Sequence, residues 1–279
     1  MIKACVIGWP ISHSRSPLIH GYWLKQHGID GSYTRIPVEP GSLAGFLTNL
    51  EASGFAGCNV TLPHKESAYR IVKCADDSTA RLGAVNTVFI RNGTILGTNT
   101  DGKGFLNSLH SGAPGLELAN RRAVVLGAGG AAMAVANVLL LQGMGEVAVV
   151  NRSFDKAELL RQRFGSRIVP VEWMHRAEVL KDTALLVNTT SLGMKGQPAL
   201  EIDLARLNPK AVVTDIVYTP LRTQLLIDAA ARGNALVEGL GMLLHQAVRG
   251  FELWFGVRPA VTGELYGIVA RDIDPEYAP

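Results

Sequence analysis

The sequence predicts an α/β protein made of two successive α/β domains. Its 279 residues are 47% hydrophobic and 18% charged, enough apolar material to fill two cores. Short apolar runs that suit buried strands alternate with helical segments in two separate series, a pattern typical of parallel sheets flanked by helices. The second series opens on a glycine-rich turn between a strand and a helix, which is typical of a doubly wound domain.

The first series occupies the N-terminal hundred residues. The expected elements are, in order, strand 3–8, helix 16–27, strand 33–38, helix 42–50 and strand 56–61. A third helix should begin at Pro63, because proline is well tolerated in the first turn of a helix. Residues 84–90 and 94–98, which Asn92 and Gly93 separate, should pair as a hairpin. The first domain should therefore contain a mainly parallel sheet.

The second series predicts strands at 123–126, 147–150, 184–188, 211–215 and 235–237. The segments between these strands suit helices, and the chain is helical again from Gly239 onward. Residues 123–145 carry no charge, and on length alone they could span a membrane. Five glycines interrupt that stretch, so we interpret it as strand, turn and helix of a soluble domain without a membrane contact.

The bulk properties exclude several other classes of partner. The net charge is only +3, and the basic residues are spread along the chain, so no nucleic-acid partner is expected. The three cysteines, Cys5, Cys58 and Cys74, have no metal-ligand spacing, and the N-terminus does not resemble a signal peptide. A cytoplasmic protein with reduced cysteines and no metal fits these features. The sequence does not fix the assembly, and a homodimer is compatible with it.

The glycine-rich turn predicts a dinucleotide site. Strand 123–126 is followed by Gly127-Ala128-Gly129-Gly130-Ala131-Ala132, a G-x-G-x-x-A pattern that leads into an apolar helix. The first glycine suits the tight turn, the second lets the backbone approach a pyrophosphate, and the small third residue allows close packing of helix and strand. The helix N-terminus would offer free N–H groups to the phosphates. The alternative is that these glycines only permit a tight turn.

The end of the next strand favours NADP over NAD. An NAD enzyme usually carries an acid there for the ribose 2′-hydroxyl, whereas this chain has Asn151-Arg152-Ser153, with Lys156 one turn later. Arg152 can bind a 2′-phosphate through two hydrogen bonds, and Lys156 adds a second positive charge. The alternative is a solvated basic pair without a ligand.

Four polar clusters fall where strands end or helices begin, which is where α/β proteins place their ligands. They are Ser12-His13-Ser14-Arg15-Ser16-Pro17, Asn59-Val60-Thr61-Leu62-Pro63-His64-Lys65-Glu66, Gly83-Ala84-Val85-Asn86-Thr87 and Thr98-Asn99-Thr100-Asp101-Gly102. Singly, each has an ordinary explanation as helix caps, turn residues or a surface charge. In this order, and together with Gly239-Leu240-Gly241-Met242-Leu243-Leu244-His245-Gln246-Ala247, they closely resemble the shikimate dehydrogenase family.

The resemblance runs from Val6 to about Val261 and implies a division of the chain. Residues 1–102, completed by helices within 240–279, would form a domain that binds the substrate. Residues 103–239 would form a Rossmann-type domain that binds NADP. The active site would lie in the cleft between them.

The implied reaction is the reversible, NADP-dependent reduction of 3-dehydroshikimate to shikimate, on the route to chorismate and the aromatic amino acids. Lys65 and Asp101 would form the catalytic acid–base pair, because hydride addition builds negative charge on the ketone oxygen. By the same resemblance, the substrate would contact Ser14, Ser16, Thr61, Asn86, Tyr218 and Gln246. The cofactor would also contact Thr189, Gly239 and Met242.

Two rival hypotheses stay open. A quinate or dual quinate/shikimate dehydrogenase would accept an extra hydroxyl at the carbon that carries the carboxylate, and Ser14 and Ser16 resemble the arrangement that selects shikimate. A non-catalytic dinucleotide-binding relative would share the fold but would have no reason to keep Lys65 with Asp101.

Overall fold

The computed structural model describes residues 1–278 and divides into two compact units. The first unit combines Met1–Thr100 with Leu244–Val269, and the second combines Asp101–Leu243 with the residues from Ala270 onward. The boundaries expected at 102 and 239 thus lie at 100 and 243, and the C-terminal residues expected in the first domain group with the second unit. Gly102 itself packs within the second unit, where a Cβ would sit 2.8 Å from the Ala134 carbonyl oxygen.

The first unit contains a six-stranded sheet. Its elements are β1 (Ile2–Gly8), α1 (Ser16–Gln26), β2 (Gly31–Pro37), α2 (Leu43–Thr48), β3 (Phe55–Val60), α3 (Lys65–Ile71), β4 (Lys73–Cys74), α4 (Asp77–Leu82), β5 (Thr87–Arg91) and β6 (Thr94–Thr98). The strand order is β2-β1-β3-β5-β6-β4. The β5–β6 hairpin is antiparallel and β5 pairs antiparallel with β3, while the other three ladders are parallel.

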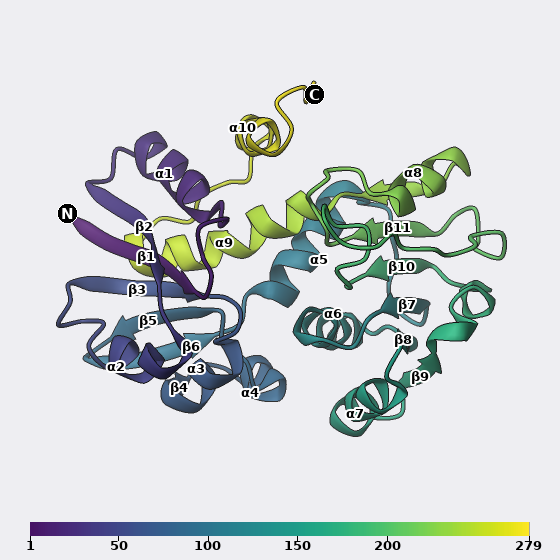
Figure 1. Ribbon diagram of the computed structural model, residues 1–279, viewed down its shortest axis with the longest axis horizontal. Coiled ribbons are helices and arrows are strands. Elements are labelled where there is room, and N and C mark those ends of the chain that lie inside the picture. The colour runs from purple at the N-terminus through teal and green to yellow at the C-terminus, as the bar shows by residue number, and fades with distance from the viewer. Residues whose placement is uncertain (279) are drawn as a thin grey trace. The chain divides into compact units, whose positions relative to one another are not determined.

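Helices cover both faces of this sheet. On one face, Leu43 and Leu47 of α2 and Ala68 of α3 pack with Cys5 and Val60. The other face carries α1 and the C-terminal helix α9 (Gly239–Phe255), which runs along the sheet in Figure 1. Gly57 of β3 lies directly under the Trp254 indole of α9, where any Cβ would collide with the ring. The indole Nε1 can therefore donate to the Val88 carbonyl at 2.9 Å.

The second unit has an all-parallel sheet. Its elements are α5 (Asp101–Gly112), β7 (Arg122–Leu126), α6 (Gly130–Leu141), β8 (Glu146–Asn151), α7 (Phe154–Phe164), β9 (Ile168–Glu172), β10 (Leu185–Asn188), β11 (Val212–Asp215), α8 (Gln224–Ala231) and β12 (Ala235–Val237). The strand order β12-β11-β10-β7-β8-β9 is that of a Rossmann domain, with the order reversing between β7 and β10. The short helix α10 (Gly263–Ile273) ends the fold.

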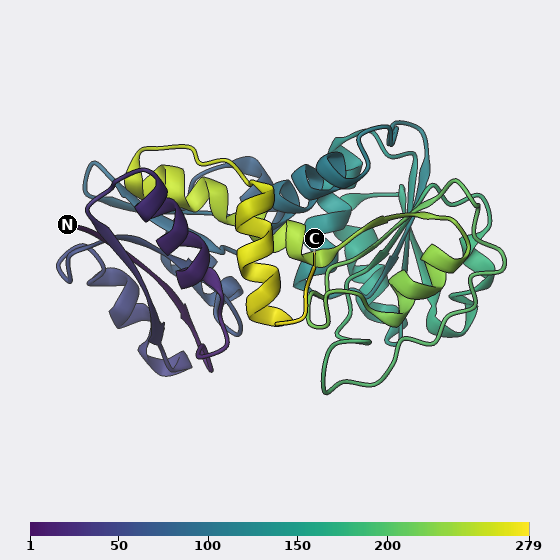
Figure 2. The ribbon, with the colours of Figure 1, turned by 90° about the horizontal axis from the view of Figure 1, so that it is seen from above.

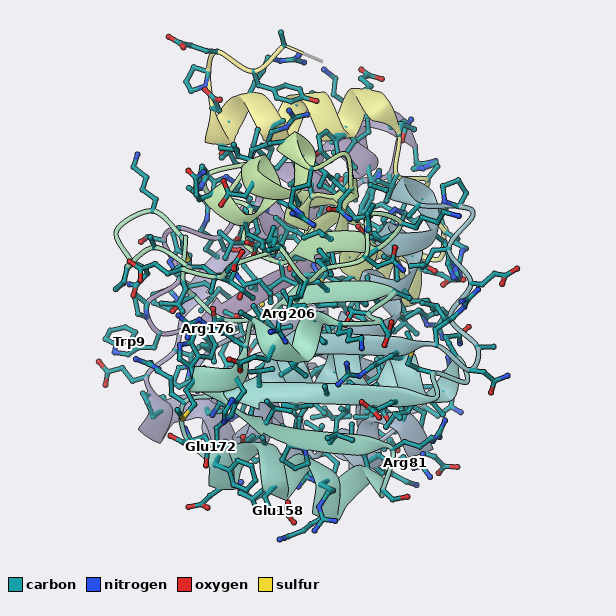
Figure 3. All side chains as sticks on the ribbon, turned by 90° about the vertical axis from the view of Figure 1, so that its right-hand side faces the viewer. Trp9, Arg81, Glu158, Glu172, Arg176 and Arg206 are labelled. Atoms are coloured by element: carbon teal, nitrogen blue, oxygen red, sulfur yellow. The ribbon has the colours of Figure 1, made fainter. Side chains whose placement is uncertain are left out.

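Alternate residues of each strand of this sheet feed two separate cores. Val125 and Val149 pack with α5, α6 and α7, whereas Val124, Leu126 and Val150 pack with α8. Figure 2 shows α5 and α6 on one side of the sheet and α8 on the other. Charged residues such as Glu158 and Glu172 lie at the periphery of the unit (Figure 3). Within residues 1–278, no helix is long and apolar enough to cross a membrane, and no three potential ligands gather as a metal site.

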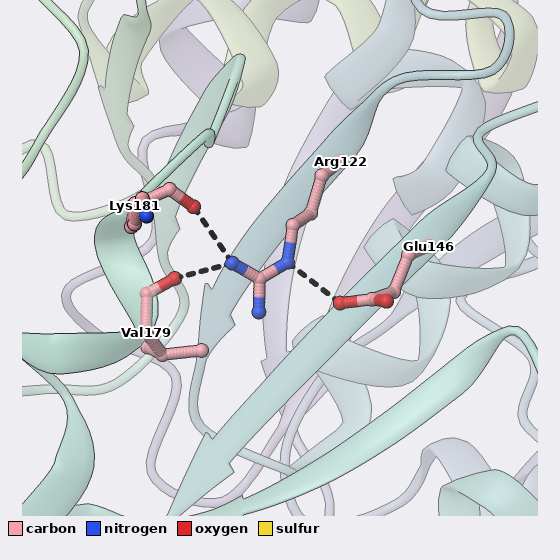
Figure 4. Close-up of polar contacts among 4 residues, drawn as sticks. All are labelled: Arg122, Glu146, Val179 and Lys181. Atoms are coloured by element: carbon pink, nitrogen blue, oxygen red, sulfur yellow. Dashed lines mark hydrogen bonds and ion pairs between the residues drawn. The ribbon is translucent and has the colours of Figure 1, made fainter.

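The amino ends of the central strands are held by one arginine. The Arg122 guanidinium at the start of β7 donates to Glu146 Oε1 of β8 at 2.6 Å. It also donates to the carbonyls of Val179 and Lys181, in the loop before β10, at 2.7 and 2.8 Å (Figure 4). This end of the sheet is opposite the carboxyl ends, where ligands bind in such folds.

Four elements differ most from the sequence prediction. The helix expected from Pro63 begins at Lys65, because Leu62 and Pro63 form a turn. Strand β9 was not expected and contains Pro170, which an edge strand tolerates because its free side needs no donor. The short elements β4 and α4 were also not expected; α4 is capped by Asp76, whose carboxylate accepts from Thr79 N at 2.8 Å.

Candidate active site

Two serines lie in the loop after β1 and at the start of α1. Ser14 Oγ donates to Ser16 Oγ at 3.3 Å and accepts from Ser16 N at the same distance. The Arg35 guanidinium of β2 donates to the Ser14 carbonyl at 2.7 Å and so fixes the loop. Ser14 is half-buried and Ser16 is buried. The first unit therefore presents two neighbouring hydroxyl groups at the carboxyl end of β1.

Thr61 and Lys65 follow the adjacent strand β3. Thr61 N donates to the Ile7 carbonyl at 3.0 Å, and Thr61 approaches Gly8 so closely that a Cβ at Gly8 would lie 2.7 Å from Thr61 Cγ2. Lys65 is the half-buried first residue of α3, and its carbonyl accepts from Val85 N at 2.9 Å. The His64 ring bonds to the Val38 carbonyl at 2.7 Å and is buried, which gives this histidine a structural role.

Asn86 is the buried centre of the same region. Its Oδ1 accepts from Thr100 N and from Thr87 Oγ1, both at 2.9 Å, while its Nδ2 donates to Thr100 Oγ1 at 3.0 Å. Its backbone joins strands on both sides, because Val60 N donates to its carbonyl and its N–H donates to Thr98. The amide of Asn86 is thus locked in one orientation beside Thr61 and Lys65.

Behind these residues lies a buried polar and aromatic layer that sequence reasoning missed. The Tyr33 hydroxyl donates to Asn59 Oδ1 at 2.5 Å, and Asn59 Nδ2 donates to the Asn86 carbonyl at 3.2 Å. The His20 ring stacks on Tyr33 with centroids 4.0 Å apart, and neither ring nitrogen of His20 has a hydrogen-bond partner within the described residues. Complete burial lowers the pKa of His20 to about 3 and raises that of Tyr33, so both are neutral.

The remaining predicted substrate and catalytic residues belong to different units. Gln246, on α9, lies in the first unit and is half-buried. Burial lowers the pKa of its neighbour His245. Asp101, the buried first residue of α5, and the half-buried Tyr218 belong to the second unit. Ser14, Ser16, Thr61, Lys65 and Asn86 all belong to the first unit, where they lie in loops and helix starts that adjoin β1, β3 and β5, whereas Asp101 and Tyr218 belong to the second unit.

The glycine turn contains one backbone conformation that favours glycine and two glycines with open space beside them. Gly127 adopts φ 104°, and a Cβ there would lie 2.8 Å from Thr189 Oγ1. Gly129 and Gly130, by contrast, have open space where a Cβ would point. Gly129 caps α6, and the amides that follow it point out of the helix start, which is typical of an anion site. The turn therefore fits a dinucleotide, with half-buried Ala128 and Ala131 beside it.

Two cationic side chains, Arg152 and Lys156, follow the end of β8, the strand after the glycine turn. Asn151 Nδ2 donates to the Ser153 carbonyl at 2.9 Å, which shapes the turn into α7. Arg152 and Lys156 are exposed, and neither forms an ion pair within residues 1–278. No acidic side chain occupies the strand end, so the electrostatics suit an extra phosphate.

Two further segments of the second unit close around the carboxyl ends of β10 and β11. Thr189 Oγ1 donates to the Leu126 carbonyl at 2.6 Å, beside Gly127. A Cβ at Gly239 would lie 2.5 Å from the Val217 carbonyl oxygen, so this glycine has a packing reason of its own. Met242 is half-buried against the core of α5 and α6.

The chain combines a doubly wound domain that carries a dinucleotide turn with a second α/β unit that presents hydroxyl, amide and amine groups. This combination is typical of a dinucleotide-dependent oxidoreductase. Three family models match the chain: "Shikimate dehydrogenase substrate binding domain" over residues 6–88, "Shikimate / quinate 5-dehydrogenase" over 111–216 and "Shikimate 5'-dehydrogenase C-terminal domain" over 239–262. The chain belongs to the shikimate dehydrogenase family.

Curated relatives and solved structures agree with this assignment. Shikimate dehydrogenase (NADP(+)) of Rhodopseudomonas palustris strain TIE-1 is 50% identical over 98% of each chain. The enzyme of the same name from Paramagnetospirillum magneticum is 52% identical over 95% of this chain and 97% of its own. The Thermus thermophilus shikimate 5-dehydrogenase, solved with NADP(H) and shikimate, is 37% identical with a TM-score of 0.86, covering 98% and 100%. The Corynebacterium glutamicum quinate dehydrogenase, solved with NAD, is 30% identical with a TM-score of 0.89, covering 96% and 99%.

Proposed function

We propose that this protein catalyses the reversible, NADP-dependent reduction of 3-dehydroshikimate to shikimate. The observation that carries the proposal is the set of polar groups that follow β1 and β3 and precede β5: two serine hydroxyls, Thr61, Lys65 and the locked amide of Asn86. Relatives at about half identity over nearly the whole chain, named as NADP-dependent shikimate dehydrogenases, support it.

The substrate has one carboxylate, several ring hydroxyls and a ketone, and the cluster offers a suitable group for each. The Ser14 and Ser16 hydroxyls would donate to the carboxylate, because charge-assisted bonds to hydroxyl donors suit a carboxylate anchor. Thr61, Asn86 and Gln246 would hold ring hydroxyls, with Tyr218 contributing from the second unit. This division fixes the ring in one orientation, so that only one ring carbon faces the reacting centre.

Lys65 and Asp101 are the proposed catalytic pair. NADPH, when bound, supplies the hydride that reduces the ketone carbon. Lys65 would place its ammonium group at the ketone oxygen, stabilise the charge that develops there and donate a proton, and Asp101 would orient the lysine and the reacting hydroxyl. In the reverse direction, the same groups accept the hydroxyl proton.

The second unit would hold NADP through three groups of residues. The α6 N-terminus, from Gly127 to Ala131, would bind the pyrophosphate, and Asn151, Arg152, Ser153 and Lys156 would bind the adenosine ribose and its 2′-phosphate. Thr189, Gly239 and Met242 would line the nicotinamide side. The free positive charge at Arg152 is what favours NADP over NAD.

A second candidate function is quinate or dual quinate/shikimate oxidation, favoured by the likeness to the Corynebacterium glutamicum quinate dehydrogenase. A non-catalytic dinucleotide-binding relative is the third candidate.

We place the protein in the cytoplasm, since its three cysteines are all free, as expected in a reducing compartment. A homodimer is the assembly we propose, and size-exclusion chromatography with light scattering tests it.

The test is the initial rate of nicotinamide reduction with shikimate or quinate crossed against NADP or NAD. Shikimate with NADP should give the highest kcat/KM. Comparable rates with quinate would transfer the protein to the dual-specificity class. Folded protein that is inactive with all four pairs, yet binds NADP in a fluorescence titration, would identify the non-catalytic relative.

A further inference from the structure

Asp215, the last residue of β11, is a fully buried carboxylate at the ligand end of the second sheet. It accepts three hydrogen bonds: from Asn188 Nδ2 at 3.0 Å, Val217 N at 2.9 Å and Thr223 Oγ1 at 2.7 Å. Burial raises its pKa, and the three donors oppose that shift. Burying a carboxylate costs free energy even when it is hydrogen-bonded, so a buried acid that joins three segments indicates a role beyond filling space in the core.

One of these donors leads from Asp215 to the glycine turn. Asn188 donates its Nδ2 to Asp215, and this bond fixes the orientation of the amide. The Oδ1 of the same amide then accepts from Thr190 N at 3.0 Å and from Thr190 Oγ1 at 2.7 Å. Thr190 Oγ1 accepts in turn from Leu192 N at 3.1 Å. Asp215 therefore sets the conformation of the whole turn after β10.

That turn defines one wall of the proposed cofactor site. A Cβ at Gly127 would lie 2.8 Å from Thr189 Oγ1 and 3.1 Å from Thr190 Cγ2, so the two threonines and the glycine turn are in van der Waals contact. Thr189 Oγ1 is also bonded to the Leu126 carbonyl at 2.6 Å. A displacement of the threonines would be transmitted directly to the turn that binds pyrophosphate.

The other two donors hold the segment after β11. Thr223 precedes α8 but does not use its hydroxyl to cap that helix, because the hydroxyl donates to Asp215 instead. Val217 lies between Asp215 and Tyr218, the proposed substrate residue. A Cβ at Gly239 would be 2.6 Å from the Asp215 carbonyl oxygen, so the start of α9 packs against the same point.

We infer that Asp215 is a positioning residue for the dinucleotide site: through Asn188 it holds Thr189 and Thr190 against the Gly127 turn, and it thereby sets the affinity for NADP. The inference rests on the proposed NADP-dependent function and adds to it a residue that touches neither substrate nor cofactor.

The experiment measures the Kd of NADP by fluorescence titration without substrate, then the KM of NADP and of shikimate, and finally the Tm. The variants are Asp215→Asn, Thr223→Val and, as a matched control, Asp203→Asn. Asp203 is an exposed carboxylate of the same unit, and its Oδ1 accepts from Ala205 N at 2.9 Å. In Asp215→Asn an NH2 group, which can only donate, replaces one of the two acceptor oxygens, so the carboxylate's three donors can no longer all be accepted.

Asp215→Asn should raise the Kd of NADP about tenfold, the cost of roughly one charge-assisted hydrogen bond, while the KM of shikimate changes less than about twofold. Thr223→Val, which removes one donor without changing the side-chain shape, should raise the Kd by a smaller factor, and Asp203→Asn should leave it unchanged. A lower Tm with an unchanged Kd would overturn the inference. If Asp215→Asn does not fold, Thr223→Val decides by the same criterion. Wild-type protein that binds no NADP would instead refute the proposed function itself.

Discussion

At the scale of single residues, the proposed reaction depends on one amine. Lys65→Met keeps most of the length of the side chain but removes the positive charge and the proton. We expect kcat to fall at least about a hundredfold, the range that general acid–base catalysis contributes, while the Kd of shikimate stays within a few-fold of wild type. Stopped assays give kcat, and calorimetric titration gives the Kd. A near-normal kcat would remove Lys65 from the mechanism.

The proposed preference for NADP over NAD depends on Arg152. Because it is exposed and has no ion pair within the described chain, Arg152→Ala should leave the fold intact. We expect the KM of NADP to rise about tenfold or more, as for the loss of a charge-assisted bond, and the KM of NAD to change little. Arg206→Ala, another exposed arginine of this unit, is the matched control. Equal effects on both cofactors would refute the 2′-phosphate assignment.

Local sequence patterns suggested the candidate binding residues but not the buried residues that hold them in place. The spacing of the neighbouring residues suggested Gly127 and Arg152, whereas no local pattern suggested Asp215 or Tyr33. Asp215 is the last residue of an otherwise ordinary apolar strand, and two of its donors, Asn188 and Thr223, come from segments that only folding brings together. Tyr33 meets Asn59 across 26 sequence positions. Such contacts have no periodicity along the chain, so a single sequence cannot reveal them.

At the scale of elements, the amino and carboxyl ends of the second sheet should respond differently to mutation. Arg122→Leu removes the donors of the Val179 and Lys181 carbonyls and leaves Glu146 without its partner. We expect a loss of about 1–3 kcal/mol in unfolding free energy and a Tm lower by several degrees. Both KM values should stay unchanged, because this edge is opposite the cofactor turn.

The control for that variant is Arg121→Leu, whose arginine is exposed and makes only a loose ion pair to Glu117 at 3.7 Å. Its effect on stability should be below about 1 kcal/mol, as for other surface pairs. A higher KM of NADP in Arg122→Leu would show that the two ends of the sheet are coupled.

The prediction of strands and helices succeeded where the apolar pattern is clear and failed where a proline interrupts it or the element is very short. The central strands β7, β8 and β10 are continuous apolar runs and were predicted within about one residue of their bounds. Strand β9 was missed because Pro170 normally argues against a strand, and only its edge position permits it. The two-residue strand β4 is too short to leave any pattern.

At the scale of the whole molecule, acid should destabilise the protein through His20. Burial lowers the pKa of His20 from 6.5 to about 3, so between these values the unfolded state binds more protons than the folded state. Stability should therefore fall as the pH drops from 6.5 toward 3, by up to about 1.4 kcal/mol per pH unit. Asp215, whose pKa is raised, acts in the opposite direction.

Urea unfolding at several pH values measures this slope, and His20→Phe isolates it. The variant keeps the stack on Tyr33 but cannot titrate, so its stability should vary less with pH across the same window. An identical slope in both proteins would show that His20 does not control the acid response, whatever the absolute stability of the variant.

The first unit is built from two separate stretches of the chain, residues 1–100 and 244–269, and this has a consequence for synthesis of the protein. Trp254 must reach Val88, which lies 166 positions earlier in the chain, before α9 can cover the sheet. Because most of α9 belongs to the first unit but follows the second unit in sequence, the ribosome makes His20, Trp23 and Tyr33 long before Phe251 and Trp254, which pack on them. The part that is synthesised first is thus completed last, and its uncovered aromatic face is a natural binding surface for a chaperone during that interval.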